Sequence, residues 1–369
     1  MNVEVRTPPS QPVIAASRQA VADCDIHPAV RRDSDLHPWL AKQWRDHLAE
    51  YGGMRRIGTG SAPAYPKGQP NASRRDAYPP EGGRQGSSLS FMQQQHLDAN
   101  NVTLGILNPL KSGQGLSHPD LAAAMCRAVN EWQVAEWTSK DSRLKASIVV
   151  PYDHGNAAAE IRHWDGHKDF VQVLMLSRTA DPLGNRRYWP IYEAAAERGL
   201  PVSMHAFGYG GSPITSSGWP SHYIEEMTGH AQNCQAGVSS LIMEGVFEQF
   251  PTLKVIMVEA GFAWAPPLAW RLDKAWKTLR SDVPHVKQLP SETMRRNIWW
   301  TTQPMEEPEP REHLRDTIEW MGWDRLLFAS DYPHWDFDDP AHVLPLRVTE
   351  QERHAFFQGN ARAVYGITE

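Results

Sequence analysis

The chain has 369 residues, of which 41% are hydrophobic, and a formal net charge of −6. This length allows one large domain or two medium ones, with a core large enough to need no disulfides. The mildly acidic charge, without a long basic run, argues against nucleic acid as the main partner. No stretch of about 20 apolar residues is present, so we predict no membrane span.

The cysteines and the N-terminal residues bear on the cellular compartment. Cys24, Cys126 and Cys234 are scattered and form no CxxC motif, so we expect no disulfide framework. Residues 1–20 lack the apolar run of a signal peptide. We therefore expect a reducing, cytoplasmic setting.

Short apolar runs recur along the chain, and most are separated by longer helical patterns. They have the length of strands buried on both faces and lack a clean polar alternation. The eight runs span residues 20–28, 101–109, 144–151, 170–176, 201–207, 253–261, 297–305 and 324–333. Two of the helical patterns carry typical end residues, since one opens at Pro119 and another ends at Gly199.

Eight strand–helix units joined by right-handed crossovers close into a barrel. We therefore predict an α/β fold, a (β/α)8 TIM barrel, that forms a single domain over residues 1–369. The alternative is an open doubly wound sheet, but the GxGxxG turn typical of that fold does not follow the first run.

Residues 49–90 interrupt the alternation of strands and helices. The segment is rich in Gly, Pro, Ser and Arg. Long segments of this kind within a compact domain are usually lids, subunit arms or disordered. We interpret it as an insertion after the first strand that lies over the barrel mouth, and a mobile surface loop is the alternative.

Polar residues that can ligate a metal end four of the apolar runs. Active sites of such barrels lie at the carboxyl ends of the strands, so we expect these side chains to meet. They are Asp25 and His27 in the first run, His205 in the fifth, Glu259 in the sixth and Asp331 in the eighth, with His334 three residues later. A mixed set of imidazoles and carboxylates suits Zn²⁺, Mn²⁺ or Fe²⁺ and leaves positions for water or substrate.

The alternation of a regular strand adds detail to the first run. Asp25 and His27 occupy positions i and i+2, which face the same side. The same alternation places Asp23 on that face, one step deeper, and turns Cys24 outward toward the helices.

Each candidate ligand also has a purely structural interpretation. An Asp-x-His pair is short and occurs by chance in many proteins. His205 fits a hydrogen-bonded core histidine, and Asp331 fits a turn cap. Glu259 fits a structural ion pair with Arg271. The combination favours a metal site, because charged residues are rarely buried without partners and four otherwise apolar strands end in polar groups.

Aromatic residues near the rim suggest a substrate pocket. Phe207, Trp264 and Trp335 could line a cavity for an apolar or aromatic substrate, although simple packing explains them as well. His230 stands near the start of the helix after the fifth strand, where it could face either the site or solvent. We take Phe207, Trp264 and His230 as candidate substrate-binding residues.

Five motifs carry a resemblance to a known family: DCDIHP, MHAFG, LIMEGVFEQFPTLKVIMVEAGFAW, FASDYPHWD and GNARAVYG. Together they resemble the amidohydrolase-related branch of the amidohydrolase superfamily, metal-dependent (β/α)8 barrels that include aminocarboxymuconate-semialdehyde and resorcylate decarboxylases. The resemblance covers residues 21 to about 366. It implies decarboxylase, hydratase, hydrolase or metal-dependent oxygenase chemistry. It also implies a ligand set of Asp25, His27, His205 and Asp331.

Two positions depart from the pattern of that family. Asp25 stands where His or Glu is more familiar, and Glu259 stands where the decarboxylases usually have a catalytic histidine. Glu259 could act as an acid or base if burial raises its pKa, or it could hold a second ion. His334 could supply the missing imidazole or contact a ligand. Asp331, Glu259 and His334 are therefore our catalytic candidates.

We predict metal-dependent hydrolysis or non-oxidative decarboxylation of a small organic acid, ester or amide. The expected cofactor is a divalent metal ion, with zinc as first choice and manganese or iron as alternatives. A dinuclear iron or manganese oxygenase, or a subunit of one, is the first alternative, and a non-catalytic structural partner subunit is the second. The family resemblance and the 15 tryptophans favour a homo-oligomer or a hetero-oligomer with a related subunit.

Overall fold

The computed structural model describes residues 19–52, 72–208 and 213–368. In this part of the chain eight parallel strands form one sheet in the order β1 to β8, and each pairs with the next. The strands are β1 Val21–Ile26, β2 Val102–Leu107, β3 Leu144–Val149, β4 Phe170–Arg178, β5 Val202–Gly208, β6 Val255–Val258, β7 Ile298–Thr301 and β8 Leu326–Leu327. The predicted (β/α)8 barrel is confirmed, with one strand in each apolar run.

The barrel closes between β8 and β1 through single contacts instead of a continuous ladder. Only residues 326–327 of the predicted run 324–333 form a strand. The backbone beyond them still bonds to β1, because the Cys24 N–H donates to the Phe328 carbonyl at 3.0 Å and the His27 N–H donates to the Tyr332 carbonyl at 2.7 Å. This seam brings the carboxyl end of β1 beside the segment that follows β8.

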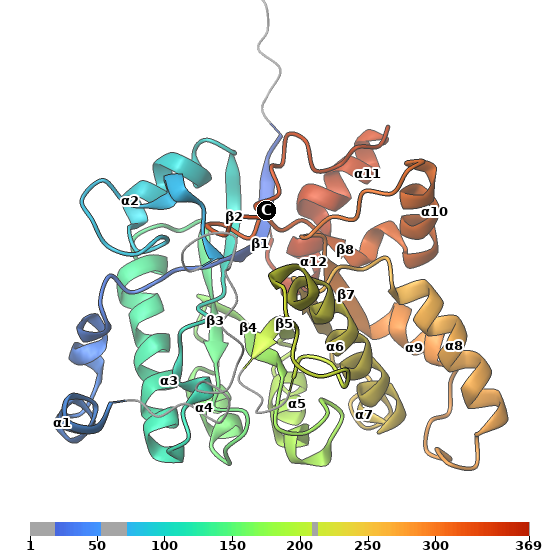
Figure 1. The fold of residues 1–369 in the computed structure, drawn as a ribbon, viewed down its shortest axis with the longest axis horizontal. Coiled ribbons are helices and arrows are strands. Elements are labelled where there is room, and N and C mark those ends of the chain that lie inside the picture. The colour runs from blue at the N-terminus through green and yellow to red at the C-terminus, as the bar shows by residue number, and fades with distance from the viewer. Residues whose placement is uncertain (1–18, 53–71, 209–212, 369) are drawn as a thin grey trace, which may run out of the picture.

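Helices surround the sheet, as Figure 1 shows. Each crossover after β2 contains at least one helix, and several helices begin with proline in the first turn. The helices are α1 Lys42–Tyr51, α2 Leu89–Met92, α3 Pro119–Gln133, α4 Ala157–His163, α5 Trp189–Ala196, α6 Tyr223–Met243, α7 Val246–Gln249, α8 Ala265–Thr278, α9 Pro290–Asn297, α10 Glu312–Met321, α11 Glu350–His354 and α12 Asn360–Tyr365.

The apolar core has a large outer part and a smaller inner part. The large cluster packs the strands against the surrounding helices. The smaller one joins side chains of β1, β2, β4, β6 and β8 to α12. These strands are not all neighbours in the sheet, so their side chains meet inside the barrel, where α12 covers one end.

The orientation expected for Asp23 and Cys24 was wrong. Cys24 packs in the inner cluster, while the Asp23 carboxylate accepts a hydrogen bond from His96. The pairing of β1 with β2 shifts register between Asp23 and Ile26, and such an irregularity breaks the strict alternation of a strand.

The described part of the segment 49–90 lies beside the loop that follows β8. Ser73 forms an antiparallel bridge with His334, and the Arg74 N–H donates to the Pro333 carbonyl at 2.9 Å. Residues 53–71 lie outside the described residues, so the position of the whole segment over the barrel mouth stays a prediction.

Candidate metal centre

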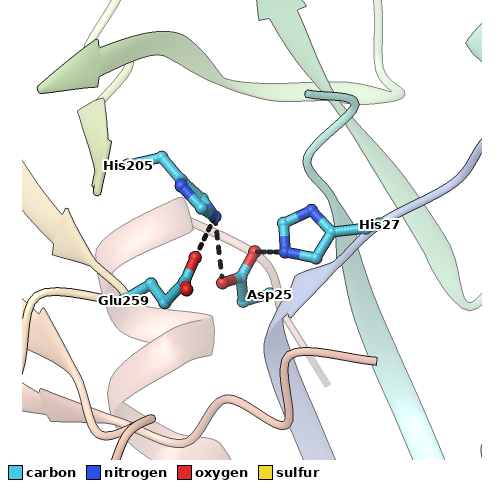
Figure 2. A group of neighbouring side chains, drawn as sticks. All are labelled: Asp25, His27, His205 and Glu259. Carbon is cyan, nitrogen blue, oxygen red and sulfur yellow. Dashed lines mark ion pairs between the residues drawn. The ribbon is translucent and has the colours of Figure 1, made fainter. Parts of the chain in front are cut away.

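The end of β1 supplies two of the candidate ligands. Asp25 is fully buried and His27 nearly so. His27 Nδ1 donates to the Asn108 carbonyl at 2.7 Å, which leaves Nε2 as the nitrogen that faces the other candidates (Figure 2). Its distance is 3.3 Å to Asp25 Oδ1 and 2.8 Å to Asp331 Oδ1. Metal-binding histidines are typically oriented in this way, with one ring N–H on a carbonyl and the other nitrogen toward the ion.

His205, at the end of β5, has the same orientation. Its Nδ1 donates to the Ala206 carbonyl at 2.5 Å. Its Nε2 lies 3.4 Å from Asp25 Oδ2 and 3.2 Å from Glu259 Oε2. Figure 2 shows these side chains converging from β1, β5 and the end of β6.

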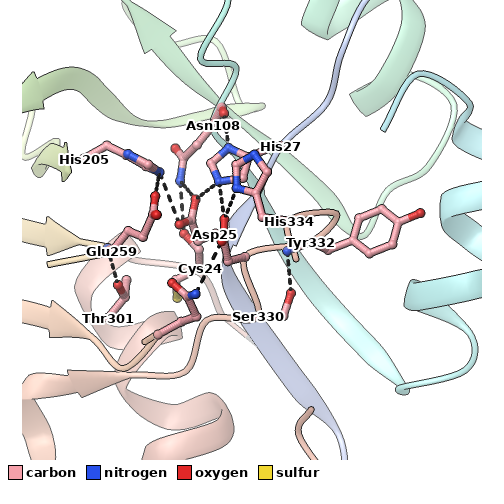
Figure 3. Close-up of polar contacts among 12 residues, drawn as sticks. Cys24, Asp25, His27, Asn108, His205, Glu259, Thr301, Ser330, Tyr332 and His334 are labelled. Carbon is pink, nitrogen blue, oxygen red and sulfur yellow. Dashed lines mark hydrogen bonds and ion pairs between the residues drawn. The ribbon is translucent and has the colours of Figure 1, made fainter. Parts of the chain in front are cut away.

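Two carboxylates reach the centre through strained backbone. Glu259 follows β6 with φ 53°, and Asp331 follows β8 with φ 61°. Residues other than glycine avoid this left-handed region, at a cost of about 1–3 kcal/mol each, and such strain concentrates at functional sites. Hydrogen bonds hold both turns. The Glu259 N–H donates to Thr301 Oγ1 at 3.1 Å (Figure 3), and the Asp331 N–H donates to the Asp25 carbonyl at 3.1 Å.

His334 completes the cluster. Its Nδ1 donates to Asp331 Oδ1 at 2.6 Å, and its ring stacks on that of His27 with centroids 4.4 Å apart. Two overlapping groups therefore have ligand atoms within 4.8 Å of one another: Asp25, His27, His205 and Glu259 in one, and His27, Glu259, Asp331 and His334 in the other.

The charges of the centre are strongly coupled. Burial raises the pKa of Asp25, but His27 and His205 outweigh it and hold the pKa well below its usual range. Burial lowers the pKa of His27, but the Asp25 and Asp331 carboxylates outweigh it and raise the pKa well above its ordinary value. The pKa of Glu259 is raised well above its ordinary value by burial and then by repulsion from Asp331. The carboxylates thus make this a point that attracts positive charge.

The residues fit a divalent cation. Three buried atoms of the described chain converge here without a hydrogen-bond partner: Asp25 Oδ2, His27 Nε2 and His205 Nε2. Buried polar atoms without partners are costly, and a cation would satisfy all three. The structure thus brings together the predicted ligands Asp25, His27, His205 and Asp331, with Glu259 and His334 beside them. That the first four bind a metal stays a prediction.

Asn108 organises the centre and was missed in the sequence. Its carbonyl fixes His27, and its side-chain amide donates to Asp25 Oδ1 at 2.8 Å (Figure 3). Its amide oxygen accepts from Ser147 Oγ at 2.8 Å and from Gln172 Nε2 at 2.9 Å. The one signal in the sequence is a polar residue near the end of the second apolar run, directly after β2, where the ligands also lie relative to their own strands.

A cavity of about 410 Å³ opens above the cluster. Phe207 and His230 line it, as do His27, Glu259 and His334. Trp264 was also predicted to bind substrate, but it is not among the described residues that line this cavity. Its indole N–H instead donates to the Ala260 carbonyl at 2.8 Å. Further lining residues include Arg84, Lys111, Tyr223, Trp335 and Asp336.

The cavity wall therefore contains basic side chains, acidic side chains and aromatic rings. Trp335 Nε1 donates to the Tyr223 hydroxyl at 3.3 Å, which joins two of the rings. Burial, followed by repulsion from Asp331, raises the pKa of Asp336 to about 7. Such a wall can hold a planar molecule that has both apolar and charged parts.

Imidazoles and carboxylates gathered at the carboxyl ends of eight parallel strands define the class of metal-dependent (β/α)8 enzymes. The sequence also matches the Amidohydrolase family over residues 22–367. The chain belongs to that family.

No helix in the described ranges combines the length and the apolar character needed to cross a membrane.

Similar proteins include two curated enzymes. γ-Resorcylate decarboxylase of Polaromonas sp. strain JS666 is 23% identical over 269 residues, which cover 69% of this chain and 80% of that enzyme. 2-Keto-4-carboxy-3-hexenedioate hydratase of Sphingobium sp. strain SYK-6 is 25% identical over 196 residues, which cover 50% of this chain and 51% of that enzyme.

A similar fold has been solved for 5-carboxyvanillate decarboxylase of Novosphingobium aromaticivorans, in complex with manganese and 4-hydroxy-3-methoxy-5-nitrobenzoic acid. The TM-score is 0.70 at 17% identity, and the match covers 95% of this chain and 97% of that one. At this identity the likeness concerns the fold.

Proposed function

We propose that this protein catalyses the metal-dependent, non-oxidative decarboxylation of a small aromatic or related carboxylic acid. The observation that carries the proposal is the convergence of Asp25 Oδ2, His27 Nε2 and His205 Nε2, all buried and without hydrogen-bond partners in the described chain, below an aromatic cavity. The similarity to a resorcylate decarboxylase and to a manganese-bound carboxyvanillate decarboxylase supports both the reaction type and manganese as the ion.

Asp25, His27, His205 and Asp331 would hold the divalent ion. When bound, the ion would supply a Lewis acid that draws electron density from substrate oxygens. Asn108 keeps Asp25 and His27 in their orientations through the hydrogen bonds described above. The backbone strain at Glu259 and Asp331 is consistent with side chains held in position for chemistry.

The cavity would orient the substrate. Phe207, Tyr223 and Trp335 offer aromatic surfaces against which a planar ring can pack. Arg84 and Lys111 place positive charge in the same wall, and positive charge favours a carboxylate. The substrate's carboxyl group would thus lie between these two side chains and the centre.

Glu259 would act as the acid. Burial and repulsion from Asp331 raise its pKa well above the ordinary value, which favours the protonated carboxyl group that an acid needs. In the reaction the bond between the carboxyl carbon and the ring breaks, CO₂ leaves, and the electron pair stays on the ring carbon. That carbon then takes the proton of Glu259, and solvent in the cavity returns a proton to the carboxylate.

The direct test measures CO₂ release. Protein freed of metal and reloaded with Mn²⁺ should release one CO₂ for each molecule of hydroxylated benzoic acid consumed, without using O₂. Metal-free protein should release none. Loss of a set of such acids without CO₂ formation, or no turnover of any of them by the Mn²⁺ form, would contradict the proposal.

A second candidate function is oxidation by a dinuclear iron or manganese centre. The favouring observation is that the two ligand groups overlap at His27 and Glu259, which offers room for two neighbouring ions. Two ions per chain together with substrate-dependent O₂ consumption would establish this function in place of decarboxylation. An assembly with a second, related subunit also stays a proposal, tested by the oligomeric state in solution.

A further inference from the structure

A fully buried pair, Asp23 and His96, lies behind the candidate ligands at the seam between β1 and β8. At most 1% of either side chain is exposed. His96 Nε2 donates to Asp23 Oδ2 at 2.8 Å, and Asn100 Nδ2 donates to His96 Nδ1 at 3.1 Å. In this arrangement His96 Nδ1 accepts, and the Nε2–H points at Asp23.

The imidazole of His96 is held on its faces as well as at its nitrogens. It belongs to the π-helical turn η4 (Gln93–Leu97), a local widening of a helix that is frequent at functional sites. The ring stacks on that of Tyr332, with centroids 4.8 Å apart and an interplanar angle of 5°. His96 is therefore a fixed donor, with little freedom to follow a displaced carboxylate.

The Asp23 carboxylate accepts four hydrogen bonds from three segments. Oδ1 accepts from the Asp25 N–H at 3.1 Å and from the Ser330 N–H at 2.9 Å. Oδ2 accepts from Ser330 Oγ at 2.5 Å as well as from His96. A single side chain thus connects β1, the segment after β8 and η4.

These bonds lie where the sheet has no continuous ladder. Asp25 is itself a proposed ligand, and Ser330 directly precedes Asp331, which is another. The carboxylate of Asp23 thus fixes the backbone of both proposed carboxylate ligands relative to each other. Metal sites need such support, because their ligands have to stay within about 0.5 Å of the productive geometry.

We propose that Asp23, held in place by His96, is a positioning residue that sets the spacing of Asp25 and Asp331 and thereby the affinity of the centre for its divalent cation. The inference rests on the proposed function, since it requires Asp25 and Asp331 to be ligands. Asp23 acts through the backbone of these residues and does not contact the substrate.

The test is the Mn²⁺ affinity of the metal-free, full-length protein, measured by competition with a chelator. Asp23→Asn keeps the shape of the side chain but removes one acceptor oxygen. His96→Phe keeps a ring to stack on Tyr332 but removes the donor. Each should weaken Mn²⁺ binding roughly tenfold to a hundredfold, as is typical when the partner of a ligand is lost. His96→Gln, which retains a donor, should recover at least part of the affinity lost in His96→Phe.

Glu160→Gln is the matched control. Glu160 is also buried, and its carboxylate accepts from Arg127, Asn130 and Trp164, none of which belongs to the centre. This variant should lose thermal stability yet keep its Mn²⁺ affinity within about twofold, because its hydrogen bonds hold no ligand.

The outcomes separate the two proposals. Wild-type Mn²⁺ affinity in both Asp23→Asn and His96→Phe would overturn the positioning role and leave the metal centre intact. If Asp23→Asn does not fold, the comparison of His96→Phe with His96→Gln decides alone. Absence of Mn²⁺ binding by the wild-type protein would instead refute the proposed function, and this inference with it.

Discussion

Replacement of Asn108 by alanine tests how the centre is held. The backbone carbonyl that orients His27 remains in Asn108→Ala, so the variant removes only the side-chain amide. The amide's bond to Asp25 Oδ1, at 2.8 Å, is one to a charged acceptor. Such a bond contributes about 1.5–3 kcal/mol, and about 1.4 kcal/mol corresponds to a factor of ten in affinity. Mn²⁺ binding should therefore weaken roughly tenfold to a hundredfold.

Asn108→Ala should also destabilise the fold. The lost amide oxygen leaves Ser147 Oγ and Gln172 Nε2 with one acceptor fewer each, and the free energy of unfolding should fall by about 2–4 kcal/mol. Urea unfolding of the metal-free protein measures this term, and chelator competition measures the affinity. Ser147→Ala is the control: it removes one donor to Asn108 and one acceptor of Gln172 but leaves the bond to Asp25 in place, so it should bind Mn²⁺ normally. Mn²⁺ affinity within twofold of wild type in Asn108→Ala would refute the reasoning, whatever happens to stability.

Three further predictions concern the acid, the cavity and pH. Glu259→Gln should keep the bound ion but lower turnover by roughly 10²–10⁴-fold, as expected for a lost general acid; loss of one of two ions would make Glu259 a ligand instead. Phe207→Ala should raise KM several-fold while Trp264→Phe leaves it unchanged, since Phe207 lines the cavity and Trp264 does not; steady-state kinetics with the reverse pattern would contradict the assigned cavity. Burial and Asp331 raise the pKa of Asp336 from 3.8 to about 7. Between pH 3.8 and about 7 the folded state therefore binds an extra proton at Asp336, and the contribution of this group to stability falls as the pH rises. Asp336→Asn should remove that fall, and equal pH slopes of unfolding free energy in wild-type and variant metal-free protein would contradict it.

The fold was predictable because each strand is an apolar run of its own. All eight runs contain a strand, including the short β8, whose neighbours 328–332 bond to β1 without forming a regular ladder. The convergence of the candidate ligands was predictable for a related reason: a polar side chain at the end of an apolar strand has few places to go other than the barrel rim.

The sequence was less informative where local geometry departs from regularity. The register shift in β1 reverses the expected orientation of Asp23 and Cys24, and no residue pattern marks such a shift. The left-handed turns at Glu259 and Asp331 are likewise set by tertiary hydrogen bonds. Trp264 lies near the rim in sequence, yet its indole N–H donates to the Ala260 carbonyl four residues earlier.

The buried network behind the ligands was missed for another reason. Asn108 and His96 are single polar residues in otherwise ordinary segments, and their importance comes from partners 83 and 73 positions away in sequence, Asp25 and Asp23. Long-range pairs of this kind become visible only when the strands are placed side by side.

The most direct test of the metal centre is the metal content of purified protein, measured by mass spectrometry for the wild type and for His27→Ala and His205→Ala. His154→Ala is the control, because His154 Nε2 bonds to the Leu116 carbonyl and lies outside the cluster. We predict that the wild type and His154→Ala hold at least one divalent ion per chain and that each of the other variants loses well over half of it. Full metal retention in His27→Ala or His205→Ala would contradict the proposed ligand set.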